Sequence, residues 1–236
     1  WLSDIPLGPL GDPLVALAFA AGATSRLKLG ANVVPLGRNP LWVAKQIAQI
    51  DRLSKGRVLI SFVPGLGQPG ERAALGLLKR DRGKRLETMM DLLRRWWAGE
   101  AVTATFGEFH FEEVRVEPRP MQQPLELWLG GKSEAAIDRV ARCADGWLTA
   151  AMTPDEVARA CEEVTRRAQE YGRVADPEHF GISLPYSIEQ PCPQAVETLQ
   201  LRRTDRDVSQ VLAVGATGLV DRLQAYQAAG LSKFVV

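Results

Sequence analysis

The sequence predicts a single α/β domain in which parallel strands alternate with helices, as in an α/β barrel. Short runs rich in β-branched residues alternate along the chain with longer segments whose apolar residues recur every three or four positions. The chain has 236 residues, the length of one such barrel, and its 46% hydrophobic and 24% charged residues are typical of a globular protein. We therefore expect residues 1–236 to form one domain.

The first half of the chain predicts strands and helices in regular alternation. Asp12 and Asn39 each precede a proline, which marks a helix start, because the side chain can cap free amides and proline lacks the amide that would go unbonded there. In order, we expect a strand ending at Asp4, a helix from Pro13, a strand at 27–34, a helix from Pro40, a strand at 57–63, a Gly/Pro-rich loop at 64–70 and an inward-packing helix at 81–97.

The second half begins with an insertion into this alternation. The segments 102–105 and 109–114, separated by Gly107, predict a β-hairpin, and the prolines at 118, 120 and 124 predict an extended linker. After the linker we expect strands at 125–129, 146–150, 180–186, 211–214 and 233–236, and helices at 132–142, 153–171 and 217–229.

Composition argues against several classes of protein. The formal net charge of +1 is too small to attract nucleic acid electrostatically. No apolar run approaches the roughly 20 residues that span a bilayer. His110 and His179 are the only histidines, and the three cysteines match no zinc spacing, so we expect no metal site. The first residues show no secretory signal, and we expect a cytoplasmic protein.

Eight short motifs follow one another at characteristic spacings across nearly the whole chain. They are DPLVAL at 12–17, TSRLKLG at 24–30, RNP at 38–40, AKQ at 44–46, LSKGR at 53–57, EPRP at 117–120, LGG at 129–131 and ADGW at 144–147. Together they resemble the luciferase-like monooxygenase family, whose members use FMN or the deazaflavin coenzyme F-420. The resemblance implies a (β/α)8 barrel of the bacterial-luciferase-like type with a β-hairpin insertion.

Members of this family usually have a strand and a helix before the position of Trp1. We therefore expect a barrel that lacks its first strand and helix, with unpaired edges that a partner could cover. Either the chain is a fragment of a longer protein or an oligomeric contact covers the seam, and the fragment is our favoured interpretation. The expected partners are a small-molecule substrate and a second copy in a homodimer, with neither nucleic acid nor membrane.

The resemblance implies a set of residues around the cofactor ring. Asp4 is the candidate catalytic residue, because it stands where luciferases carry a histidine and several deazaflavin enzymes an aspartate; a loop or capping aspartate is the alternative. Ala31 and Asn32 lie in a stretch that supports the ring in relatives through a bulge with a non-proline cis peptide. Val63 and Gly65 follow the next strand. An arginine near the phosphate in luciferases has no counterpart there, which favours F-420 over FMN.

The four residues Gly130, Gly131, Lys132 and Ser133 join a predicted strand to a predicted helix. Small residues at such a turn allow backbone amides and the positive end of the helix to face a phosphate, and Ser133 could add a side-chain hydrogen bond. The alternative is an ordinary strand-to-helix turn. In the light of the resemblance, the phosphate would belong to FMN or to the tail of F-420.

The predicted function is that of an oxidoreductase. The leading hypothesis is hydride transfer between F-420 and a small organic substrate, with the cofactor carrying the chemistry. An FMN-dependent luciferase-like monooxygenase is one alternative, and a non-catalytic barrel subunit is another. A barrel aldolase or isomerase fits less well, because no lysine or glutamate lies at several strand ends together.

Overall fold

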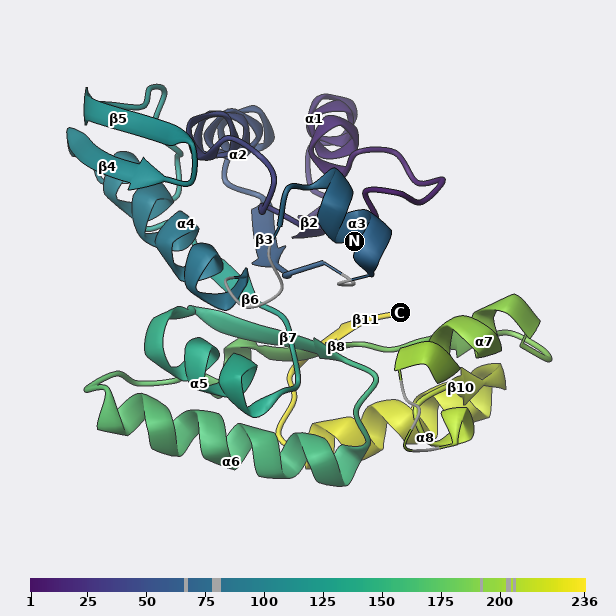
Figure 1. Cartoon of the computed structure of the whole chain (residues 1–236). Helices are drawn as coiled ribbons and strands as arrows, with labels where there is room; N and C mark the ends of the chain where they lie inside the picture. Colours follow the sequence, from purple (N-terminus) through teal and green to yellow (C-terminus); the bar gives the residue numbers. More distant parts are fainter. Residues whose placement is uncertain (66–67, 78–81, 192, 203–204, 206) are drawn as a thin grey trace. The chain divides into compact units, whose positions relative to one another are not determined.

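The computed structural model describes residues 1–65, 68–77, 82–191, 193–202, 205 and 207–236. It divides into two compact units, residues 1–128 and 129–236 (Figure 1). Among the described residues, no helix is long and apolar enough to cross a membrane.

The described residues of unit 1 form three parallel strands, four helices and a hairpin. Its elements are β1 (Leu2–Ser3), α1 (Pro13–Ala23), β2 (Leu29–Val33), α2 (Pro40–Ser54), β3 (Val58–Phe62), α3 (Pro69–Ala74), α4 (Arg82–Trp97), β4 (Val102–Phe106) and β5 (Phe109–Val114). The boundary between the units falls within β6 (Leu127–Leu129).

The parallel strands of unit 1 follow the order β1-β2-β3. In register, Ser3 pairs with Asn32, and Asn32 pairs with Ser61. Helices α1 and α2 pack against each other and against these strands (Figure 1). Both helices begin as predicted: Asp12 Oδ1 accepts from the amides of Leu14 and Val15, and Asn39 Oδ1 accepts from the amide of Leu41.

The predicted inward-packing helix, which is α4, and the predicted hairpin are both confirmed. The indole of Trp96 donates to the carbonyl of Val114 at 3.0 Å and that of Trp97 to the carbonyl of Ala44 at 3.0 Å. Strands β4 and β5 are antiparallel, and Gly107 turns between them at φ +61°. The apolar residues that α4 buries fully or almost fully are Leu86, Met89, Met90, Leu93, Trp96 and Trp97.

Unit 2 repeats the pattern of parallel strands and helices. Strands β7, β8 and β11 are parallel neighbours, and α5 packs against α6. Thr153 and Glu156 form a capping box at the start of α6, as the predicted helix start requires. The elements are α5 (Glu134–Cys143), β7 (Gly146–Ala150), α6 (Pro154–Glu170), η2 (Pro177–His179), β8 (Phe180–Ser183), β9 (Tyr186–Ser187), α7 (Pro193–Arg202), η3 (Val208–Gln210), β10 (Ala213–Val214), α8 (Gly215–Ala228) and β11 (Lys233–Val235).

The structure departs from the predicted elements in three places. Helix α3 occupies part of the expected loop at 64–70, because Pro69 provides a good first helical residue; residues 66–67 of that loop lie outside the described part. The expected strand at 180–186 is divided into β8 and β9 near Pro185, which has no amide for a sheet hydrogen bond. Helix α7 was not predicted.

Candidate functional site

In unit 1, a hollow of about 270 Å³ lies beside the carboxyl ends of β1 and β2. The amide of Asp4 donates to the carbonyl of Asn32 at 2.9 Å, so two of the predicted site residues are joined directly. Such strand ends carry the active sites of α/β barrel enzymes. The lining residues are Asp4, Ile5, Pro6, Leu10, Gly11, Asp12, Val34, Arg38 and Leu75.

Asp4 is a paired carboxylate, with a side chain only 5% exposed. Its Oδ2 accepts from the amide of Val34 at 3.0 Å and from Nη2 of Arg38 at 2.9 Å. The same Nη2 lies 2.8 Å from Oδ2 of Asp12. Arg38, which the sequence interpretation did not single out as a site residue, therefore bridges two carboxylates; its only signal was its place in the RNP motif.

The charges of this trio shift the ionisation of two members. Burial by itself would raise the pKa of Asp12, but the hydrogen bonds from Arg38 and from the amides of the helix start outweigh it and hold that pKa below its ordinary value. Burial likewise would lower the pKa of Arg38, yet the two carboxylates raise it. Both shifts favour the charged forms of Asp12 and Arg38.

Ala31 and Asn32 lie in β2, one step apart. Ala31 is completely buried. Oδ1 of Asn32 is also buried and has no hydrogen-bond partner among the described residues, and the same is true of Oγ of Ser61 on β3. Ser61 was missed by the sequence interpretation, because a serine in a strand gives no signal of its environment.

The bulge that the resemblance associates with this stretch in relatives is not seen at residues 29–33 of this chain. β2 pairs with β3 without a register shift from Leu29 to Val33, and the two cis peptide bonds found among the described residues are Glu117–Pro118 and Gln123–Pro124. The tight pairing continues past the strand end, because the amide of Val63 donates to the carbonyl of Val33 at 3.0 Å.

Gly65 follows at φ +79°, and a Cβ there would lie 2.5 Å from Oε1 of Glu71. A larger residue would therefore strain the backbone and displace the side chain of Glu71, whose residue is buried.

In unit 2, the predicted turn lies between β6 and α5. Gly131 has φ +123°, and a Cβ on it would lie 2.7 Å from Cβ of Ala136. Its carbonyl accepts from the indole of Trp147 at 2.9 Å. Ser133 caps α5, because its Oγ accepts from the amide of Ala136 at 3.3 Å. Both Lys132 and Ser133 are exposed.

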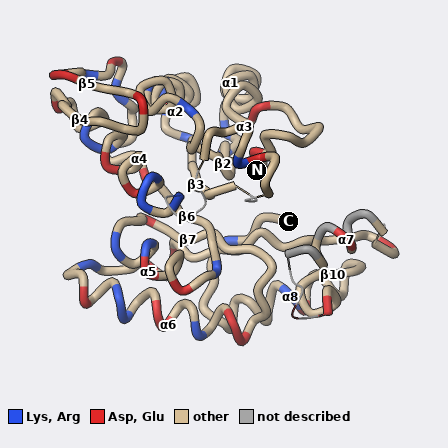
Figure 2. The backbone as a smooth tube through the Cα atoms, viewed as in Figure 1, with Lys and Arg blue, Asp and Glu red and all other residues tan. Residues whose placement is uncertain are grey.

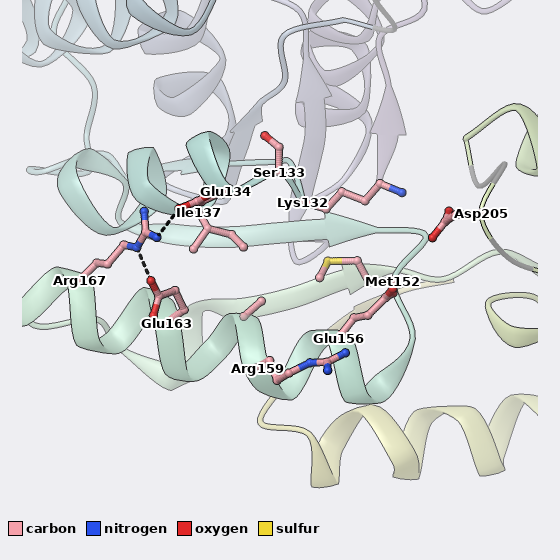
Figure 3. Close-up of a pocket in the computed structure, with 11 residues that line it drawn as sticks. Lys132, Ser133, Glu134, Ile137, Met152, Glu156, Arg159, Glu163, Arg167 and Asp205 are labelled. Atoms are coloured by element: carbon pink, nitrogen blue, oxygen red, sulfur yellow. Dashed lines mark hydrogen bonds and ion pairs between the residues drawn. The ribbon is translucent and has the colours of Figure 1, made fainter.

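A groove of about 610 Å³ runs along α5 and α6 in the same unit (Figure 3). Arg167 pairs with Glu163 on its own helix α6 and with Glu134 on the neighbouring helix α5. The hydrogen bonds from Arg166 and Arg167 lower the pKa of Glu163 to about 2. The charged residues that line this groove on α5 and α6 are therefore paired with one another and hold the two helices together. Lys132 and Ser133 are the polar lining residues nearest the turn.

In both units, candidate site residues follow the carboxyl ends of parallel strands, where α/β barrel enzymes carry their active sites. The family model described as "Luciferase-like monooxygenase" matches residues 3–232, and the chain belongs to this family. The predicted family is therefore confirmed.

A sequence relative and several solved structures resemble the chain. It is 32% identical over 149 residues to the FMNH(2)-dependent dimethylsulfone monooxygenase of Pseudomonas fluorescens (strain Pf0-1), a match that spans 62% of this chain and 40% of the relative. An F-420-dependent secondary alcohol dehydrogenase in complex with an F-420–acetone adduct has a TM-score of 0.83 at 17% identity, covering 100% of this chain and 82% of that one.

A third comparison is the oxygenating constituent of 3,6-diketocamphane monooxygenase from Pseudomonas putida, a type II Baeyer–Villiger enzyme in complex with FMN. It has a TM-score of 0.77 at 15% identity, covering 100% of this chain and 80% of that one. At such low sequence identity, the similarity to these structures concerns the fold alone. It confirms the predicted luciferase-like barrel class.

Proposed function

We propose that the chain is an oxidoreductase of the luciferase-like family that uses the deazaflavin F-420 for hydride transfer to or from a small organic substrate. The observation that supports a phosphate-bearing cofactor is the Gly130–Ser133 turn, where Gly131 leaves no room for a Cβ beside Ala136. The amide of Ala136 is already capped by Ser133, so the amides of Glu134 and Ala135, which precede it, are the ones that would face a phosphate. The preference for F-420 over FMN rests on the absence of an arginine at Pro64 and Gly65.

Each unit, taken by itself, contains residues that fit one chemical part of such a cofactor. Oδ1 of Asn32 is a buried acceptor without a partner among the described residues, and it could accept from the ring. Gly130, Gly131 and the exposed Lys132 and Ser133 would hold the phosphate. F-420, when bound, supplies a ring carbon that accepts or donates a hydride.

The remaining residues would place and shield the ring. Ala31, Val63 and Gly65 would offer backbone and small side chains at the strand ends. A direct catalytic role for Asp4 stays a prediction; its contacts support a positioning role, in which it holds the guanidinium of Arg38 beside the carboxyl ends of β1 and β2.

A second candidate is an FMN-dependent monooxygenase. The relative at 32% identity has this cofactor in its name, which favours FMN. The ring and phosphate contacts proposed above serve FMN equally well. The two candidates therefore differ in the cofactor that binds and in the reaction that follows, and share the site.

Replacing Gly131 with alanine tests the proposed phosphate turn. The new Cβ would meet Ala136 at 2.7 Å and strain a φ of +123°, so we expect binding of F-420 to weaken at least tenfold, about 1.4 kcal/mol. Fluorescence titrations with F-420 and FMN measure this, with circular dichroism to verify folding.

Gly218→Ala is the matched control, because a Cβ at this helical glycine meets nothing within 4 Å. It should bind like the unaltered chain. Equal affinities of both variants would contradict the role of the turn. Preference for FMN would select the second candidate, and binding of neither cofactor would leave a non-catalytic subunit.

We propose further that the chain forms a homodimer through α1. This helix contains no charged residue (Figure 2), and it exposes 71% of Val15 and 79% of Phe19, one turn apart on the same side. A helix that is apolar on all sides is normally covered. A second copy would offer the same uncharged face and cover it symmetrically.

Phe19→Asp is expected to convert this dimer into a monomer, because it places a charge in the apolar contact. Analytical ultracentrifugation measures the change. Val174→Asp is the control, since Val174 is as exposed but lies in unit 2. A monomeric unaltered chain, or a Phe19→Asp variant that remains dimeric, would contradict this assignment.

A further inference from the structure

Part of the lining of the hollow beside β1 and β2 is apolar. It includes residues of the loop at 5–11, which contains only apolar side chains and glycine. Leu10 lines the hollow and is 55% exposed, and Leu75 lines it as well. The amide of Gly8 donates to the carbonyl of Ile5 at 2.8 Å, which holds the loop in a turn. Open apolar side chains around a hollow are typical of a small-molecule site.

The charged part of the same lining consists of Asp4, Asp12 and Arg38. Nε of Arg38 donates to the carbonyl of Val34 at 3.2 Å, and its Nη2 lies 2.9 Å from Asp4 and 2.8 Å from Asp12. Nη1 makes no hydrogen bond to the described residues. A guanidinium has N–H donors on all three nitrogens, so Arg38 retains donors for a ligand in the hollow.

The charges of the lining favour a neutral ligand. The lining contains two carboxylates, Asp4 and Asp12, and one guanidinium. A carboxylate or phosphate bound beside Arg38 would lie close to both aspartates, and like charges repel strongly where water is scarce. The oxygen of a ketone, aldehyde or sulfone can accept from Arg38 without this repulsion.

The size of the hollow limits the ligand further. Its volume is about 270 Å³. A water molecule takes up about 30 Å³ of the liquid, so the hollow has room for on the order of ten non-hydrogen atoms. The three fused rings of a flavin or a deazaflavin contain more atoms than this. The hollow therefore suits a molecule smaller than the cofactor ring.

We propose that this hollow binds the substrate, and that the substrate is a compact neutral molecule with an apolar body and an oxygen acceptor. Nη1 of Arg38 donates to that oxygen, and Leu10 and Leu75 cover the apolar body. The inference rests on the proposed function, because it names the substrate class of that oxidoreductase. Arg38 and Leu10 become specificity-determining residues, and Asp4 and Asp12 exclude anions.

Three cyclic probes of similar size test the preferred chemistry. Cyclopentanone has the neutral oxygen, cyclopentanecarboxylate has a charge, and methylenecyclopentane has the shape of the ketone without its oxygen. Saturation-transfer NMR measures their affinities for the full chain, with and without F-420 or FMN. We expect cyclopentanone to bind at least about tenfold more tightly than the carboxylate. Asp4→Asn should narrow this gap, because it removes one of the two repelling charges.

Two altered chains test the residues, with circular dichroism to verify folding. Arg38→Met combined with Asp4→Asn removes the donor without leaving the Asp4 carboxylate unpaired. It should weaken cyclopentanone about tenfold, because a hydrogen bond from a charged donor is lost, and change methylenecyclopentane by less than about twofold. Leu10→Asp should weaken both probes, because it places a charge in the apolar part of the lining. Leu7→Asp is the matched control, since Leu7 is 62% exposed on the same loop and does not line the hollow.

The outcomes separate this inference from the proposed function. Equal losses of cyclopentanone and methylenecyclopentane in the double variant would overturn the inference alone, as would a Leu10→Asp chain that binds both probes like Leu7→Asp. Titration with F-420 and FMN tests the proposed function independently. A chain that selects cyclopentanone as expected but binds neither cofactor would overturn the proposed function, and the hollow would then bind a ligand that is not a substrate of such an oxidoreductase.

Discussion

Asp51→Ala is expected to lower the free energy of unfolding by about 3–4 kcal/mol, because hydrogen bonds to a buried charged group contribute about 1.5–3 kcal/mol each and their loss leaves donors unpaired. Asp51 is 0% exposed near the end of α2. Its carboxylate accepts from the amide of Met121 at 2.7 Å, the amide of Gln122 at 2.9 Å and Nε2 of Gln122 at 2.7 Å. Asp51 therefore fastens the proline-rich linker to the core of unit 1.

Urea unfolding followed by circular dichroism measures this effect. Asp91→Ala on α4 is the control, because the side chain of Asp91 is 65% exposed and its ion-pair distance to Arg95 is 3.9 Å. We expect the control to change stability by less than about 0.5 kcal/mol. If Asp51→Ala is no less stable than the control, the linker is not held by this carboxylate.

Arg38→Met is expected to cost about 2–4 kcal/mol, because it removes the cation from a buried pair and leaves the carboxylate of Asp4 behind. The partial exposure of Arg38 places the effect below that of a fully buried pair. The double variant Arg38→Met with Asp4→Asn should recover more than half of the loss, since a neutral amide does not need the guanidinium. Thermal or urea unfolding of the three proteins measures the coupling.

The effect of Arg38→Met should also depend on pH. Arg38 holds the pKa of Asp12 below its ordinary value of 3.8, so the stability contributed by this contact is complete above that value and is lost as pH falls through the lower, folded pKa. The gap between the unaltered chain and Arg38→Met should therefore narrow below about pH 4. A gap that widens in acid would show that the contact is not an ion pair.

Much of the local structure followed from single residues. Asp12, Asn39 and Thr153 marked helix starts, because a capping side chain acts on amides two or three residues away. Gly107 marked the hairpin for a similar reason, since its turn needs a positive φ. Helix α7 gave no comparable signal, because its segment begins with Pro193, which suits either a loop or a helix.

The site was predictable in part. Asp4 and the Gly130–Ser133 turn were found because they follow strands, and strand ends can be read from local pattern. The contact of Asp4 with Arg38 spans 34 residues of sequence and arises only when β1 and β2 pair. Ser61 had no signal, because whether a strand serine is buried and unpaired depends on its neighbours in space.

Calorimetric titration of the unaltered protein with F-420 and with FMN tests the central claim most directly. We expect saturable binding of at least one of the two. Heats of dilution alone from both titrations would contradict the assignment of this chain as a cofactor-binding oxidoreductase.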